Sequence, residues 1–340
     1  MSKSLSIDDF LDLAKSYSVI DVRTPAEFDK GHIPGAINIP LFTNEERVIV
    51  GTLYKKTGRQ AAILKGLELV GPKLKSIVEE SIKLVKDNTL LVHCWRGGMR
   101  SGSVAWLLET YGIKTITLKG GYKFYRRKII STFEKEYKLF VIGGRTGSSK
   151  SKVIQQLQNK NAQLLDLEKL AHHKGSSYGH LGEETQPSQE MFENLLGSTL
   201  MRFDANKRIV MEDESRMVGI RAIPNVFYVQ LRNAPILYLD VPFENRVKYL
   251  SEEYGKFDQD ALVEATLRIE KRLGSEQTKN ACLAIRENRM QDDCRIILGY
   301  YDKAYDYGLS LRKEIEITRL DINEYDEKTM KTIEEIILRE

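Results

Sequence analysis

The sequence predicts an α/β protein with two domains, and three observations lead to that prediction. Short apolar runs alternate with helical stretches along the first 130 residues, as in a mainly parallel sheet covered by helices. A second series of this kind begins with the apolar run "KLFVIGG" at 138–144. The chain has 340 residues, which is long enough for two hydrophobic cores.

The first domain is expected over residues 1–130. A short helix is predicted around Pro25 to Lys30, a helical region over 44–86, and an amphipathic helix over 101–112 that ends at Gly112, since glycine readily takes the left-handed conformation of a helix end. The predicted strands are "VIDV" (19–22), "INIP" (37–40), "TLLVHC" (89–94) and "TITL" (115–118).

The second domain is expected over residues 131–340, with a helix that starts at Lys150. From Phe257 onward the chain is predicted to be mostly helical, and its last helix carries Ile333, Ile336 and Ile337 on one face. The predicted strands are "KLFVIGG" (138–144), "AQLLDL" (162–167), "RIVMED" (208–213) and "APILYLD" (234–240).

Composition excludes several classes of protein. No apolar run approaches the ~18 residues of a membrane helix, and the start "MSKSLSIDDF" lacks a signal-peptide pattern, so a cytoplasmic protein without a membrane partner is expected. The net charge of +4 permits an RNA partner without requiring one. Neither the three cysteines nor the five histidines have metal-ligand spacing, so no disulfide framework and no structural metal are expected.

The stretch "LVHCWRGGMRSG" places Cys94 after a buried strand and before a helix. Backbone N–H groups converge at such a position, and with the nearby arginines they are expected to lower the pKa of the thiol and to stabilise anionic adducts. A buried structural cysteine is the alternative. The predicted site has Cys94 as the catalytic residue and an anion cradle made of Trp95, Arg96, Gly97, Gly98, Met99 and Arg100.

The stretch "GGRTGSSKS" approximates the G-x-x-x-x-G-K-[ST] phosphate loop and lies between a strand and a helix, as that motif requires. Ser149 stands where the motif has glycine, so we expect backbone strain of about 1 to 3 kcal/mol or a reshaped loop. Diphosphate binding tolerates this change better than nucleotide hydrolysis does, and a turn without a ligand is the alternative. The predicted diphosphate-binding residues are Gly144, Arg145, Thr146, Gly147, Ser148, Ser149, Lys150 and Ser151.

Acidic residues end the strand "RIVMED". Glu212, Asp213 and Glu214 lie where phosphate-loop enzymes hold a carboxylate-bound Mg²⁺ ion; Glu212 and Asp213 are the candidate pair, and a solvated acidic turn is the alternative. No tightly bound cofactor is expected. In the later "LDVPFENRVKYL", Arg246 either faces phosphates or belongs to an amphipathic helix.

Two further stretches are candidates for substrate contacts. "GGYKFYRRK" interleaves aromatic and basic residues, which suits a single-stranded RNA loop or an amphipathic interdomain helix equally well. "HHKGSSYG" (172–179) suits phosphate contacts or a solvated loop. The predicted RNA contacts are Lys123, Tyr125, Arg126 and Arg127.

The segments "DVRTPAEFDKGHIPGAINIP", "HCWRGGMRS" and "LKGGYKFY" resemble a rhodanese domain. The resemblance implies that Cys94 carries a sulfur or selenium atom and that Asp21 and Arg23 are structural supports. The loop from Cys94 to Arg100 has the length found in rhodanese-like cell-cycle phosphatases, one residue longer than in most sulfur-transfer rhodaneses. A tetrahedral, phosphate-sized group would fit such a cradle.

The whole chain resembles the bacterial-type tRNA 2-selenouridine synthases, through segments such as "VGTLYKKTGRQAA", "DLEKLAHHKGSSYGHLG", "QPSQEMFE", "MEDESRMVG" and "YYDKAY". The resemblance implies a transferase that acts on tRNA with 2-thiouridine at the wobble position. Geranyl diphosphate would first alkylate the sulfur, and selenium from selenophosphate would then displace geranylthiol. The alternatives are a sulfurtransferase or phosphatase fused to a nucleotide-dependent small-molecule kinase, and a regulatory protein with two degenerate anion sites.

Overall fold

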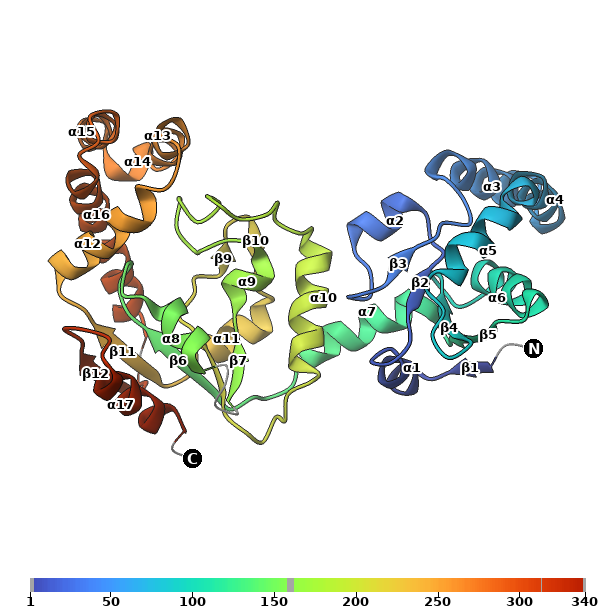
Figure 1. Ribbon diagram of the computed structural model, residues 1–340, viewed down its shortest axis with the longest axis horizontal. Helices are drawn as coiled ribbons and strands as arrows, with labels where there is room; N and C mark the ends of the chain where they lie inside the picture. Colours follow the sequence, from blue (N-terminus) through green and yellow to red (C-terminus); the bar gives the residue numbers. More distant parts are fainter. Residues whose placement is uncertain (1–2, 158–161, 313, 339–340) are drawn as a thin grey trace. The chain divides into compact units, whose positions relative to one another are not determined.

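The computed structural model describes residues 3–157, 162–312 and 314–338 (Figure 1). The chain divides into two compact units, one formed by Met1–Thr132 with Ser188–Ser198 and the other by Phe133–Pro187 with Thr199–Glu340. Each unit contains a five-stranded sheet in which all neighbours are parallel. The predicted α/β class with mainly parallel sheets is therefore confirmed.

The first sheet has the strand order β1-β5-β4-β2-β3. Its central strands are buried on both faces, which is why they are continuous apolar runs in the sequence. Leu90 and Val92 share a core with Val104 and Leu108 of α6, whereas His93 contacts Phe10 of α1. The strands are β1 (Lys3–Leu5), β2 (Val19–Asp21), β3 (Ile37–Asn38), β4 (Thr89–His93) and β5 (Lys114–Leu118).

The helices of the first unit begin and end where local signals place them. Thr24 and Thr43 each form a capping box with the glutamate three residues later, and Gly112 takes the left-handed conformation at the end of α6, with φ 104°, as predicted. The helices are α1 (Ile7–Leu13), α2 (Pro25–Lys30), α3 (Asn44–Lys56), α4 (Arg59–Val70), the 3₁₀ helix η1 (Gly71–Lys73), α5 (Leu74–Ile82), α6 (Met99–Tyr111) and α7 (Gly121–Thr132).

Helix α10 (Gln189–Leu200) contributes Ser188–Ser198 to the first unit although it follows in the sequence much later. The Asn194 amide donates to the Tyr122 hydroxyl (2.7 Å) and to the His32 carbonyl (2.9 Å), and its oxygen accepts from Arg126 (2.6 Å). The predicted boundary between residues 130 and 131 leaves this segment in the second domain. The sequence could not show its place in the first unit, because contacts between distant residues leave no local pattern.

The second sheet has the strand order β12-β11-β6-β8-β7. Its outer strand β12 lies in the region expected to be mostly helical, so that expectation is wrong there. The strand is half-exposed at the sheet edge, and charged side chains replace the apolar run of a central strand. The strands are β6 (Leu139–Gly143), β7 (Gln163–Leu165), β8 (Ile209–Glu212), β11 (Ile236–Asp240) and β12 (Ile317–Asp321), with the hairpin of β9 (Met217–Val218) and β10 (Arg221–Ala222).

Helices complete the second unit by packing on the sheet and by forming a separate helical subdomain. One face of the sheet packs on α8 and α17 through residues such as Ile154 and Ile333, and a helical subdomain forms a second core around Leu262 and Ile297. The helices are α8 (Lys150–Leu157), α9 (Leu167–Ala171), α11 (Asn225–Asn233), α12 (Phe243–Tyr254), α13 (Gln259–Leu267), α14 (Glu270–Leu273), α15 (Ser275–Arg286), α16 (Met290–Ser310) and α17 (Glu327–Leu338). Within the described residues, no helix has both the length and the apolar character needed to cross a membrane.

Substitution of Asn194 tests the role of α10 in the first unit. We expect Asn194→Ala to lower the free energy of unfolding of this unit by about 2 to 3 kcal/mol, because it leaves buried hydrogen-bonding groups without partners. Both tryptophans of the chain, Trp95 and Trp106, lie in the first unit, so tryptophan fluorescence during urea unfolding reports on it alone. The exposed Asn206→Ala is the matched control, and an Asn194→Ala transition at the wild-type urea concentration would contradict the prediction.

Candidate functional site

Cys94 lies at the end of β4, where the chain leaves the sheet and turns into α6. Its side chain is buried, and its Sγ is 3.2 Å from the Ser101 hydroxyl in the first turn of α6. The partial positive charge of that helix end favours an anion on or near the sulfur. Of the predicted cradle, Trp95 is half-buried, whereas Arg96, Gly97, Gly98 and Met99 are exposed, so the loop surface is accessible to a ligand.

Two glycines allow the loop to lie close to the chain behind it. A Cβ on Gly97, whose φ is +63°, would lie 2.4 Å from the Leu118 carbonyl oxygen. A Cβ on Gly121, whose φ is +60°, would lie 2.3 Å from the Cys94 carbonyl oxygen. That oxygen accepts a hydrogen bond from the Tyr122 N–H (2.9 Å). Only glycine tolerates such approaches, so the loop path requires the first glycine of "GGMRS", Gly97, and the second glycine of "GGYKFY", Gly121.

Arg100 is paired within the protein. Its two terminal nitrogens donate to both carboxylate oxygens of Glu27, at 2.6 and 3.2 Å. Burial works against the ionisation of Glu27, but Arg100 holds the pKa of this carboxyl below its usual value. Arg100 therefore supports the loop with much of its charge balanced, and the exposed Arg96 is the cation with more freedom to meet a ligand. Glu27 was not among the predicted site residues. The Thr-x-x-Glu spacing of the capping box from Thr24 to Glu27 was the pattern that could have drawn attention to it.

The expected structural supports lie directly behind the cysteine loop. Arg23 and Asp21 form an ion pair (2.6 Å) in which both side chains are fully buried, and the Arg23 guanidinium lies 3.8 Å from the centre of the Tyr122 ring. Removing one partner of such a pair would leave an uncompensated buried charge. The pair therefore fixes β2 and the start of α7 against each other.

The second candidate site is the loop between β6 and α8. Lys150 donates to the Gly144 carbonyl (2.8 Å), and the Gly144 N–H donates to the hydroxyl of Tyr305 on α16 (2.9 Å). The loop therefore closes on itself in the manner of an anion-binding nest. Ser151 in the first turn of α8 donates to Glu168 (3.2 Å).

The two arginines near this loop are also engaged in ion pairs. Arg145 bonds to Asp306 at 3.0 and 2.8 Å, which raises the pKa of its guanidinium. Arg246, buried, bonds to both oxygens of Asp302 at 2.7 Å and donates to the Thr146 carbonyl (3.2 Å). Of the two interpretations of Arg246, the structure favours the amphipathic helix over a phosphate contact, since the side chain lies on the buried face of α12 and supports the loop.

Ser149 has a φ of +55°. A residue with a Cβ pays a steric cost in this left-handed region that glycine avoids. The loop thus keeps the backbone of the usual motif and accepts the strain, instead of taking a different path. Ser148 precedes it with a buried hydroxyl, and its carbonyl accepts from Tyr325.

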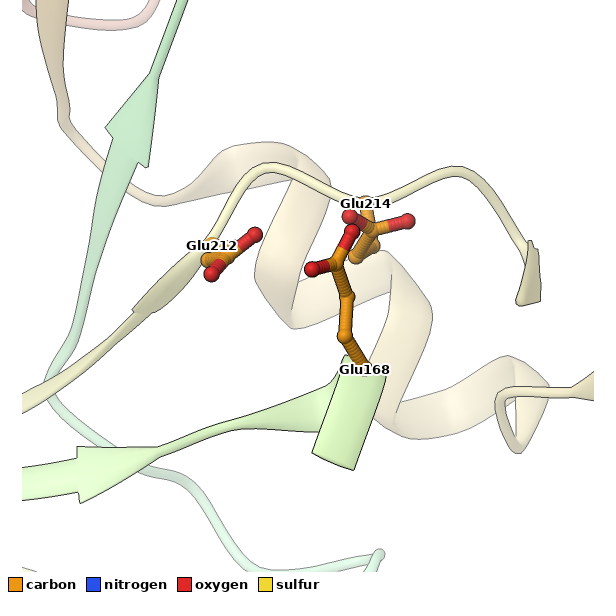
Figure 2. Close-up of side chains that lie close together, drawn as sticks. All are labelled: Glu168, Glu212 and Glu214. Carbon is orange, nitrogen blue, oxygen red and sulfur yellow. The ribbon is translucent and has the colours of Figure 1, made fainter. Parts of the chain in front are cut away.

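Three carboxylates gather beside the loop, as Figure 2 shows. Glu168 follows β7, Glu212 ends β8 and Glu214 lies two residues further, and one oxygen from each lies within 4.8 Å of the others. Burial raises the pKa of all three groups. Repulsion from Glu168 adds to this effect at Glu212, whose pKa rises to about 8, and at Glu214, whose pKa lies well above the usual value, whereas Asp166 adds to it at Glu168. Oxygen donors of this kind suit a hard divalent cation.

The structure corrects the predicted carboxylate pair. Glu212 belongs to the cluster, but Asp213 is directed away from it and bonds to Tyr305 (2.8 Å) and to Arg312. Successive residues of a strand point to opposite faces, which explains why Glu214 and not Asp213 joins Glu212. Glu168 carried no motif of its own in the sequence.

The cluster fits a Mg²⁺ ion. One oxygen of Glu212 is buried and has no hydrogen-bond partner among the described residues, and such an oxygen is satisfied by a cation or a proton. The residues that would hold the ion are Ser151, Glu168, Glu212 and Glu214.

The predicted tRNA contacts on α7 divide into two groups. Tyr125 is buried and bonds to Ser198 (2.7 Å), and Arg126 is paired with Glu193 (2.5 Å), so neither is available to RNA. Arg127 lies over the ring of the exposed Phe124 (5.5 Å). Lys123 is half-buried. This helix therefore fits the alternative of an amphipathic packing helix better than a complete RNA platform.

A cavity of about 1270 Å³ lies in the second unit and is lined by both the phosphate loop and the glutamate cluster. Its lining includes Lys150, the three clustered glutamates, and from "HHKGSSYG" His172, Lys174 and Ser176. His173 is buried, and Ser177 donates to the Ala265 carbonyl (2.8 Å). The cavity exceeds the ~300–1,000 Å³ of ordinary small-molecule sites, which leaves room for more than a diphosphate.

Comparison with known proteins matches both halves of the chain. Residues 6–128 match the rhodanese-like domain and residues 137–335 match the tRNA 2-selenouridine synthase AAA domain. Proteins called tRNA 2-selenouridine synthase from Shewanella woodyi and Sulfurovum sp. are 34% and 35% identical, over 89% and 86% of this chain and 90% and 88% of theirs. The chain belongs to the tRNA 2-selenouridine synthase family.

Other relatives match parts of the chain. The tRNA 2-selenouridine synthase of Nitrosomonas europaea is 40% identical over 69% of this chain and 63% of its own length. A crystal structure of an N-terminal domain from Clostridium difficile 630 is 42% identical, covers 38% of this chain and 99% of that domain, and has a TM-score of 0.35. The full-length relatives and the two domain matches confirm the resemblance to the tRNA 2-selenouridine synthases at the level of the family.

Substitution of Ser149 tests the strain in the phosphate loop. We expect Ser149→Gly to raise the free energy of unfolding of the second unit by about 1 kcal/mol, because glycine carries no steric cost at positive φ. Calorimetry of the full chain would measure the shift. Ser149→Ala keeps the strain and removes only the hydroxyl, so equal stabilisation by both variants would show that the backbone is not the cause.

The clustered glutamates predict a pH dependence. Because their pKa values are raised in the folded state, the fold binds protons that the unfolded chain releases, so stability is greatest below pH 4.5 and is lost as the pH rises to about 8. One such proton is worth about 1.4 kcal/mol per pH unit. Urea unfolding without divalent cations, at pH 5 to 8, should show a smaller slope in Glu214→Gln than in wild type. Equal slopes in the two proteins would contradict the prediction.

Proposed function

We propose that this chain converts 2-thiouridine at the wobble position of tRNA into 2-selenouridine, using geranyl diphosphate and then selenophosphate. The observation that carries the proposal is the presence in one chain of a thiol loop and a phosphate loop, in a family whose relatives are called tRNA 2-selenouridine synthases. The two loops supply what the two half-reactions need, which is a thiol beside an anion site for selenophosphate and a site for a leaving diphosphate.

In the first half-reaction the thiocarbonyl sulfur attacks the first carbon of the geranyl group, and the bond from that carbon to the diphosphate breaks. Negative charge accumulates on the departing diphosphate. Lys150 and the N–H groups of the phosphate loop stabilise that charge in the transition state. A Mg²⁺ ion at the glutamate cluster would supply further charge neutralisation to the diphosphate.

In the second half-reaction selenium displaces geranylthiol from the base. The selenium of selenophosphate attacks C2 of the alkylated base, the bond from C2 to the geranylated sulfur breaks, and water then cleaves the Se–P bond to release phosphate. Cys94 directs this attack. Arg96 and the exposed N–H groups of the cysteine loop bind the phosphate part of selenophosphate, in keeping with a loop long enough for a tetrahedral anion. Arg100, held by Glu27, maintains the shape of that loop.

Two substitutions test this division of labour. We expect Cys94→Ala to reduce formation of 2-selenouridine at least a hundredfold and to spare S-geranyl-2-thiouridine, whereas Lys150→Ala should reduce geranylation about a hundredfold, since removing one charge-stabilising donor costs about 10²–10³ in rate. The measurement is mass spectrometry of nucleosides from 2-thiouridine tRNA incubated with geranyl diphosphate and Mg²⁺, with or without selenophosphate.

Cys282→Ala and the exposed Lys207→Ala are the matched controls and should behave as wild type. Equal loss of both products in both Cys94→Ala and Lys150→Ala would reject the division of labour. If wild-type protein forms neither nucleoside, the proposed function is wrong.

A further inference from the structure

The cavity of the second unit has two chemically different parts. The phosphate loop and the glutamate cluster form its polar part. The other part is a wall of four aromatic side chains, Tyr254, Phe257, Tyr300 and Tyr301, all of which line the cavity. We call these four residues the ring wall.

The polar ends of neighbouring tyrosines are already bonded within the protein. The Tyr301 hydroxyl accepts from the Ser177 N–H (3.0 Å), and the Tyr178 hydroxyl bonds to Thr266 (2.7 Å). The Tyr305 hydroxyl accepts from Gly144 and donates to Asp213. Within the ring wall, the Tyr301 hydroxyl is engaged in this way and the Tyr254 hydroxyl bonds to Ser176, so these two tyrosines present mainly ring carbon to a ligand in the cavity.

The ring wall is held rigidly from behind. Tyr254 stacks on the buried Tyr178, with ring centres 4.8 Å apart and planes 18° apart. All four residues of the wall pack against the helical core that contains Leu262 and Ile297. A wall that is already ordered loses little conformational entropy when a ligand binds.

Helix α12 connects the ring wall to the phosphate loop. Arg246, in its first turn, donates to the Thr146 carbonyl, and a Cβ on Gly147 would lie 3.1 Å from Leu250. Tyr254 ends the helix eight residues after Arg246, which is about 12 Å along the axis. The wall therefore extends away from the place where a diphosphate would lie.

This arrangement selects a class of ligand. An anion site continuous with an aromatic wall, in which Phe257 has no hydroxyl and the hydroxyls of Tyr254 and Tyr301 are engaged within the protein, fits a diphosphate with a hydrocarbon arm. A nucleotide base would instead need hydrogen-bond partners along its edge, because buried polar groups without partners cost binding energy. We infer that the ring wall binds the hydrocarbon arm of a prenyl diphosphate whose diphosphate lies on the phosphate loop.

The inference rests on the proposed function for the choice of geranyl diphosphate as the ligand, and it adds the residues that recognise the arm. The residues of the ring wall are far from Lys150 in the sequence. Their side chains are uncharged, so truncating one of them leaves the charge of the phosphate loop as it is. Truncating the wall should therefore weaken binding of the arm and leave binding of the anion unchanged.

The experiment is equilibrium binding of geranyl diphosphate, inorganic diphosphate and ADP to the full chain. We expect Phe257→Ala to weaken the binding of geranyl diphosphate about tenfold and Phe257→Leu to weaken it about threefold, since alanine removes more apolar contact area than leucine does. The affinity for inorganic diphosphate should change less than about twofold, because this ligand has no hydrocarbon arm. Tyr307→Ala, which removes an exposed tyrosine on the same helix as Tyr300, is the control, and thermal unfolding verifies that each variant folds.

Several results would overturn the inference. These are a parallel loss of geranyl diphosphate and inorganic diphosphate in Phe257→Ala, unchanged affinity for both, or wild-type protein that binds ADP or inorganic diphosphate as tightly as geranyl diphosphate. The proposed function is tested separately. Binding that depends on the ring wall without any S-geranyl nucleoside would contradict the function alone, whereas normal geranylation with an unchanged KM in Phe257→Ala would contradict the inference alone.

Discussion

Both candidate sites depend on one constraint, which is that parallel strands end at the same edge of their sheet. Cys94 follows β4 and leads into α6, and the phosphate loop follows β6 and leads into α8. Glu168 lies in α9 just after β7, and Glu212 ends β8 of the second sheet. Helix N-termini and free backbone N–H groups gather at such an edge, so each sheet places its reactive groups where anions bind well.

Most of the charge near these sites is balanced within the protein. Arg23, Arg100, Arg145 and Arg246 are each held by a carboxylate. A buried charge without a partner is costly, and these pairs make the loops rigid. In the proposed function, anion binding would rely on backbone N–H groups with a small number of cations, chiefly Arg96 and Lys150. A preorganised site of this kind favours charge that develops during a reaction.

Local patterns predicted much of the fold and of both loops. The apolar runs located β2, β4, β6, β8 and β11, because central parallel strands are buried on both faces. Glycine and lysine at motif positions located the anion loops and exposed the anomaly at Ser149. The edge strand β12 was missed because it carries no apolar run. The position of α10 in the first unit was missed because its contacts join residues about seventy positions apart in the sequence.

The sequence by itself determined which residues could carry the chemistry, since Cys94, Lys150 and their glycines act through their own side chains and backbone. Only the tertiary structure decided which neighbours are available to a ligand. It paired Arg100 with Glu27, turned Asp213 toward Arg312, and brought Glu168 and Glu214 to Glu212. The physical reason is that pairing and burial depend on distances across the fold, which spacing along the chain does not contain.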